Sequence, residues 1–232
     1  MSSLLDQAES VDHFRAACAA SPLNAAARAG CSYTLWPDQS LAVKAQAMVG
    51  DKAQVVILHP TAEGGMPHTR PLALPEEGPA FSRHTRPLAL PLALPTAKFQ
   101  GIIALPAYFP ESRLPDTLRH ELVHIAQRAS PPSLAPDWTP VDPREIPEHW
   151  VAKARLNPDT LAARWQAWES RYVPIPCFLR EDKPSLRDIE LYWYDRRSGR
   201  ALKQPPSSFT QRYGAAGVAA MEHPYELQAY SH

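Results

Sequence analysis

Two spacings of hydrophobic residues occur along the chain, and they predict different elements. Apolar residues recur every three or four positions in segments 2–20 and 116–129, which predicts a helix in each. Asp116 is the expected N-cap of the second helix. Its apolar stripe consists of Leu118, Leu122, Ile125 and Ala129.

Two more helices are expected in the C-terminal half. The run Asn-Pro-Asp-Thr at 157–160 is typical of a helix start, because asparagine is a good cap and proline suits the first helical position. Leu161, Trp165 and Trp168 would form the buried stripe of that helix. A short final helix is expected to begin at Pro224.

Strands are predicted where apolar residues alternate with polar ones or form a short run. Segment 32–60 alternates in this way and contains the run 55–58, which has the composition of a buried strand. Residues 98–109 predict a strand that leads into a loop. Residues 189–194 predict an aromatic strand that turns at Arg197, Ser198 and Gly199.

The interleaved helices and strands predict a single α+β domain over residues 1–232. Within it, the seven residues that begin at His68 recur word for word from His84. A repeat this short cannot be a solenoid unit. We interpret residues 61–97 as a proline-rich flap or insertion. The two histidines lack the spacing of a metal-binding pair and are not expected to be ligands.

The composition and net charge of the chain argue against several classes of function. Hydrophobic residues make up 44% and charged residues 21% of the chain, which is typical of a soluble globular protein. The net charge is zero, so no nucleic-acid partner is expected. The sequence has no apolar run long enough to span a bilayer and no signal-like N-terminus. We therefore expect a cytoplasmic protein without a membrane partner, whose three cysteines are idle thiols.

The most informative motif is His120-Glu121-Leu122-Val123-His124. Residues four apart on a helix project from the same face, so the two imidazoles can bind one Zn²⁺ ion. Glu121 is rotated by about 100° from His120, which puts its carboxylate beside the metal. From there it could take a proton from the zinc-activated water and deliver it to a leaving amine.

At these residues the chain resembles the zincin metallopeptidases. The resemblance implies that His120 and His124 are zinc ligands and that Glu121 is the general base. It also implies that the motif helix packs beneath a mixed or antiparallel sheet whose edge strand aligns the substrate. Residues 99–105 are the expected edge strand. A polypeptide is the expected substrate.

A catalytic zinc site usually has a third protein ligand. The metzincin pattern would need glycine at 127 and histidine at 130, where this chain has Gln127 and Ser130. A deformylase would need a Gly-Cys-Leu segment, which the chain lacks. Glu226, on the C-terminal helix, is similar to the third ligand of gluzincin peptidases and is preferred. His223 and Glu222 remain alternatives.

The developing oxyanion needs a hydrogen-bond donor. Tyr230 and Tyr225 flank the expected third ligand, and Tyr213 lies upstream. The sequence therefore favours a zinc metalloendopeptidase. Two alternatives remain open: a catalytically inactive zincin-fold protein with a binding role, and a zinc hydrolase of non-peptide amides.

Overall fold

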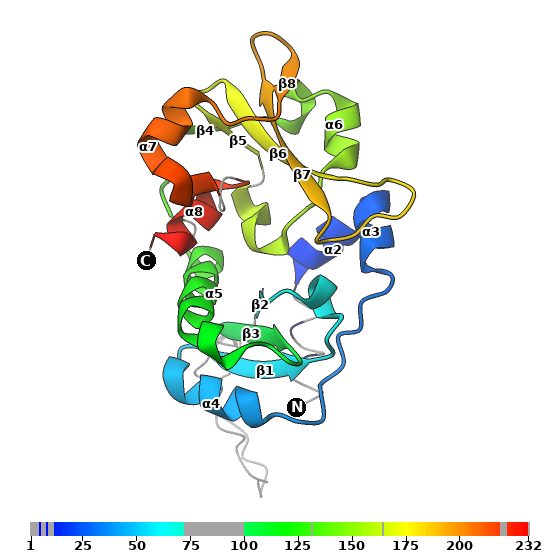
Figure 1. Ribbon diagram of the computed structural model, residues 1–232, viewed down its shortest axis with the longest axis vertical. Helices are drawn as coiled ribbons and strands as arrows, with labels where there is room; N and C mark the ends of the chain where they lie inside the picture. The colour runs from blue at the N-terminus through cyan, green and yellow to red at the C-terminus, as the bar shows by residue number, and fades with distance from the viewer. Residues whose placement is uncertain are drawn as a thin grey trace, which may run out of the picture.

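The described part of the chain folds around two separate β-sheets (Figure 1). The computed structural model describes residues 12–71, 100–130, 132–163, 165–218 and 222–231, together with Leu5 and Ala8. The repeat copy with His84 and most of the expected flap lie outside the described residues. Helices and strands are mixed along the chain, which confirms the α+β class.

The first sheet has three described strands in the order β1, β3, β2. β1 (Gln54–Leu58) runs parallel to β3 (Gly101–Pro106), and β2 (His68–Pro71) is antiparallel to β3. Two helices, α4 (Ser40–Val49) and α5 (Leu114–Ala129), share a core cluster with alternate residues of β1 and β3. The strand predicted at 55–58 and the helix predicted at 116–129 are therefore confirmed.

The β-structure predicted for most of segment 32–60 is wrong, because residues 40–49 form α4. Ala42, Ala45 and Val49 are buried at helical spacing, whereas Val43 is 71% exposed. The apparent alternation came from a segment rich in alanine, the residue with the highest helix propensity. Packing against β1 then selected the helical face.

The strand predicted within residues 98–109 is confirmed as β3, but its expected position at the edge of the sheet is wrong. β3 lies between β1 and β2, and all six of its residues are buried, as in a strand covered on both faces. Among the described strands, β2 is the outer strand on the side of α5, and its residue His68 pairs with Ala104 of β3.

The second sheet is antiparallel, with five described strands in sequence order. They are β4 (Trp138–Pro140), β5 (Gln166–Trp168), β6 (Tyr172–Phe178), β7 (Ile189–Asp195) and β8 (Arg200–Leu202). β7 confirms the predicted aromatic strand. The predicted turn connects it to β8, with Gly199 at a φ of 70° that suits glycine.

The helix predicted from residue 157 is wrong in type and length. Residues 158–163 form a short 3₁₀ helix, η4 (Pro158–Ala163), after which the chain enters β5. Trp168 pairs with Trp138 across β5 and β4, and Trp165 is buried in a neighbouring core cluster. Burial of Trp168 within the second sheet and of Trp165 beside it outweighed the local helix signal.

The remaining elements connect the sheets. α2 (His13–Ala19), within the segment predicted to be helical, and α3 (Pro22–Arg28) lie between the two sheets in Figure 1. α6 (Glu148–Lys153) and α7 (Ser207–Val218) border the second sheet, and the predicted final helix is α8 (Pro224–Tyr230). Three further 3₁₀ turns are η1 (Ala62–Gly65), η2 (Glu111–Arg113) and η3 (Pro143–Glu145). No helix in the described part of the chain is both long enough and apolar enough to cross a membrane.

Candidate metal centre

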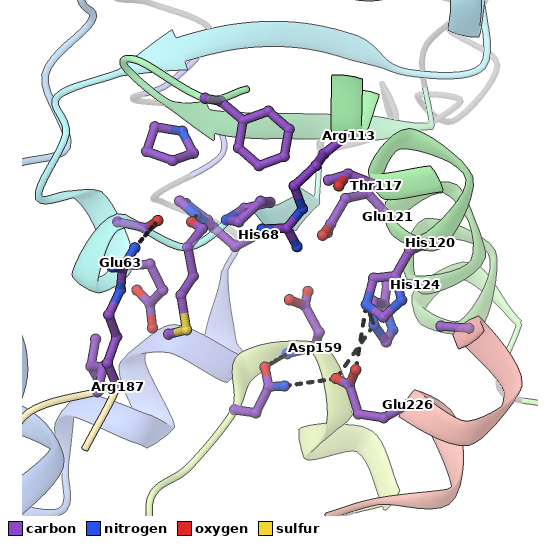
Figure 2. A pocket seen from close by; sticks show the side chains of 18 of the residues that line it. Glu63, His68, Arg113, Thr117, His120, Glu121, His124, Asp159, Arg187 and Glu226 are labelled. Carbon is purple, nitrogen blue, oxygen red and sulfur yellow. Dashed lines mark hydrogen bonds and ion pairs between the residues drawn. The ribbon is translucent and has the colours of Figure 1, made fainter. Parts of the chain in front are cut away.

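Helix α5 carries the motif, and its two faces have different roles. One packs on the core of the first sheet, and the other faces a cavity. Leu114, Leu118 and Ile125 pack into the core of the first sheet. The N-cap is Arg113, and Asp116, the expected cap, lies in the first turn instead. His120, Glu121 and His124 project from the other side of the helix into a cavity (Figure 2).

Glu226 of α8 meets the two motif histidines. The distance between His120 Nε2 and His124 Nε2 is 3.0 Å, and each nitrogen lies 3.4 Å from one carboxylate oxygen of Glu226. A tetrahedral ion with bonds of about 2.0–2.1 Å would hold its ligand atoms about 3.3–3.4 Å apart. The three side chains therefore form a group whose donor atoms suit a metal ion.

A hydrogen bond orients His124 for this role. Its Nδ1 is 2.8 Å from Gln127 Oε1, an acceptor, so Nδ1 carries the proton and Nε2 is left to bind a metal. The Gln127 amide group is oriented in turn because its Nε2 donates to the Tyr225 carbonyl oxygen at 3.2 Å and to Gln228 Oε1 at 3.1 Å. The same contacts join α5 to α8.

A second amide side chain holds Glu226. Asn157 Nδ2 donates to Glu226 Oε1 at 2.9 Å, and Asn157 Oδ1 accepts the backbone N–H of Asp159 at 3.0 Å. Asp159 Oδ1 accepts from Arg128 Nη2, on α5, at 3.0 Å. The segment 157–159 therefore connects the carboxylate of α8 to the helix that carries the histidines.

The protonation states of the two histidines and of Glu226 depend on one another. Burial alone would lower the pKa of His124, but the neighbouring carboxylate of Glu226 outweighs it and raises this pKa to about 10. Burial would raise the pKa of Glu226, but His124 and His120 hold it well below its ordinary value. The group thus favours a positive charge at its centre, carried by a proton or by a metal ion.

Glu121 differs from the other acidic residues of the site. It is 4% exposed, and its Oε2 is buried without a hydrogen-bond partner in the described structure. Burial, together with the negative charge of Asp159, raises the pKa of Glu121 to about 7. A carboxylate that titrates near neutral pH is suited to both accepting and returning a proton.

The cavity beside this group has a volume of about 1120 Å³. His68 of β2, the loop after β3 and residues of α5 and α8 line it, together with residues of segments 60–67, 155–159 and 186–189. Figure 2 shows His68, Asp159 and Arg187 around the same space as the motif histidines. Drug-sized ligands usually occupy pockets of about 300–1,000 Å³. The space can therefore hold several residues of an extended peptide.

The three candidate oxyanion donors lie in different surroundings. Tyr230 lines the cavity, and its ring lies 4.5 Å from the ring of His120, centroid to centroid. Tyr225 is 2% exposed, packs against His223 and does not line the cavity. Tyr213 packs against Trp168 and Phe209. Of the three, only Tyr230 is placed to reach a bound substrate.

The alternative third ligands have other partners. His223 is the N-cap of α8, and its Nδ1 accepts the backbone N–H of Tyr225 at 3.1 Å. Glu222 forms an ion pair with Arg155. Neither belongs to the group formed by His120, His124 and Glu226.

Several residues around the site were not expected there from the sequence. Asn157 and Asp159 were interpreted as a helix start, and Gln127 served only to exclude the metzincin pattern. His68 was set aside for its spacing, yet it is buried in the cavity wall, and its Nδ1 lies 3.2 Å from the Met66 carbonyl oxygen. The Asn-Pro-Asp run was the one local signal, and it pointed to a helix.

Comparison of the chain with protein-family models, with curated proteins and with solved structures finds no match. Its function therefore has to be inferred from the chemistry of the site.

Proposed function

We propose that this protein is a zinc-dependent metallopeptidase of the gluzincin type, with His120, His124 and Glu226 as ligands and Glu121 as general base. One observation carries the proposal: donor atoms of the three ligand residues lie within 4.8 Å of one another, and Glu121 lines the same cavity. Two imidazoles and one carboxylate are a donor set typical of catalytic zinc.

Each residue of the proposed site has a separate chemical role. When bound, the ion would supply Lewis-acid activation of a water molecule. Glu121 accepts a proton from the attacking water and returns it to the leaving amine. Tyr230 is the candidate donor to the developing oxyanion. Residues 99–105 are given no part in aligning the substrate, because β3 is an inner strand among the described strands, and His68 of β2 lines the cavity instead.

Two features of the site favour peptide hydrolysis over the alternatives. Glu121 keeps a buried carboxylate oxygen without a partner, which is costly and unnecessary in a protein that only binds. The cavity, at about 1120 Å³, is larger than a small amide substrate would need. The first feature supports an enzyme over a binding protein, and the second supports a polypeptide over a small amide substrate.

The decisive experiment compares the zinc-loaded protein with its Glu121→Gln variant. Each is incubated with a mixture of synthetic peptides, and the products are identified by mass spectrometry. We expect cleavage by the parent, inhibition by a chelator, and a loss of about 10²–10⁴-fold in the variant at unchanged zinc content. A variant that cleaves as fast as the parent would contradict the assignment of the base. A parent that binds zinc and cleaves no peptide would contradict the peptidase proposal and favour one of the two alternatives, an inactive protein or a hydrolase of non-peptide amides.

A further inference from the structure

The charged side chains that line the cavity are almost all paired. Four carboxylates are held by arginines: Glu63 by Arg28, Asp116 by Arg119, Asp159 by Arg128, and Glu222 by Arg155. Glu121 and Glu226 belong to the catalytic group. Two cavity arginines, Arg113 and Arg187, have no carboxylate partner in the described part of the chain. The charge left over for a substrate is therefore positive.

Of these two arginines, Arg187 is already engaged and Arg113 is not. Arg187 Nη2 donates to the Gly65 carbonyl oxygen at 2.6 Å. Arg113 is exposed, and its guanidinium carbon lies 5.8 Å from the centroid of the Phe109 ring, with no carboxylate partner among the described residues. Figure 2 shows its side chain pointing from the start of α5 into the cavity. Its guanidinium can therefore exchange water for a ligand at little cost.

Arg113 is aligned with the reacting centre. Arg113, Thr117 and Glu121 follow one another at intervals of four, which is one face of α5, and all three line the cavity. Eight positions of a helix span about 12 Å. An extended peptide covers that length in three to four residues. A group bound by Arg113 would thus lie within about four residues of the scissile bond.

The chemistry of this end of the cavity selects a carboxylate. A guanidinium group matches the two oxygens of a carboxylate with two parallel hydrogen bonds. The N-terminal end of α5 adds a positive helix dipole on the same side.

We propose that the enzyme prefers peptides with a carboxylate within four residues of the scissile bond, and that Arg113 binds this carboxylate. The inference rests on the proposed peptidase function. The carboxylate belongs either to an aspartate or glutamate side chain or to the C-terminus of the substrate. The two sources share the same chemistry, and substrates can distinguish them.

The test uses matched peptides built on a sequence that the parent enzyme cleaves. One series replaces glutamine by glutamate at each of the four positions on either side of the scissile bond, with both ends blocked. A second series compares a free C-terminus with an amide. We expect one carboxylate position to raise kcat/KM by about 10–100-fold, the size of a charge-assisted pair. Arg113→Gln should lower kcat/KM for the carboxylate peptide to the level of its neutral counterpart in the same variant, and Arg113→Lys should restore part of the preference.

Arg119→Gln is the matched control, since it removes the same charge from the same helix at a residue already paired with Asp116. It should keep the preference. No preference in the parent, or a preference that survives Arg113→Gln, would overturn the inference.

Should the parent cleave no peptide, calorimetry of blocked peptides that differ only in one glutamate or glutamine, with the zinc-loaded Glu121→Gln protein, decides the question. Tighter binding of the glutamate peptide that depends on Arg113 would uphold the carboxylate site while the peptidase proposal fails. Equal binding would overturn the site.

Discussion

Asn157 Nδ2 donates a hydrogen bond of 2.9 Å to Glu226 Oε1, although the two residues are 69 positions apart in the chain. The bond restrains the carboxylate that faces His120 and His124. Partners of metal ligands in this position fix the orientation of the ligand and raise its affinity for the ion. Asn157 is thus a positioning residue for the proposed metal centre.

We predict that Asn157→Ala lowers zinc affinity by about 10–100-fold, because Glu226 loses the contact that orients it. Affinity is measured by competition with a chromophoric chelator. Gln54→Ala is the control, since its amide group bonds to Gln46 at 3.1 Å and does not line the cavity. Equal affinity of Asn157→Ala and the parent would refute this role.

We predict that Glu226→Ala loses most of its bound zinc, because one of three protein ligands is removed. Glu222→Ala should keep its zinc, since Glu222 pairs with Arg155 and is not part of the group. Elemental analysis after dialysis measures both, with circular dichroism to verify that each variant is folded. Retention of zinc by Glu226→Ala would exclude Glu226 as a ligand.

We predict that Tyr230→Phe lowers kcat by about 10²-fold with little change in KM or zinc content, because a donor to the oxyanion acts in the transition state. Steady-state kinetics on a cleaved peptide checks this. Tyr225→Phe is the matched control, as Tyr225 lies outside the cavity and should leave kcat unchanged. The role fails for Tyr230 if both variants behave alike.

A buried ion pair next to the cavity should make stability depend on pH. Glu63 Oε1 is 2.5 Å from Arg28 Nη2, and Glu63 Oε2 accepts from the Tyr33 hydroxyl at 2.8 Å. Burial alone would raise the pKa of Glu63, but Arg28, His68 and Arg15 outweigh it and hold the pKa below 4.5. A lowered pKa means that the stabilisation is present in full above pH 4.5 and is lost as the pH falls through the folded-state value.

We therefore predict that Glu63→Gln lowers the free energy of unfolding by about 3 kcal/mol at pH 7, because Arg28 stays buried without its partner. The difference from the parent should shrink below pH 4.5. Urea unfolding between pH 7 and pH 3 measures it. Glu111→Gln breaks an exposed pair with Lys44 and should cost less than about 1 kcal/mol. A difference for Glu63→Gln that is constant with pH would show that the ion pair is not its source.

The sequence by itself determined the features that depend only on residues close together along the chain. The spacing of His120 and His124 put both imidazoles on one face of a helix, and the apolar run at 55–58 and the aromatic run at 189–194 became β1 and β7. Glu226 was selected from the sequence by its resemblance to a ligand helix. That it meets the histidines is a property of the packing of α8 on α5.

The tertiary structure alone decided which distant residues meet. It turned segment 40–49 into a helix against β1, placed β3 in the middle of its sheet, and brought Asn157 and Asp159 between α5 and α8. Helical and strand periods are local, so a short stretch of sequence expresses them. A contact across 69 positions exists only after the whole chain has packed, because the free energy that holds it comes from burial in a core built from many segments.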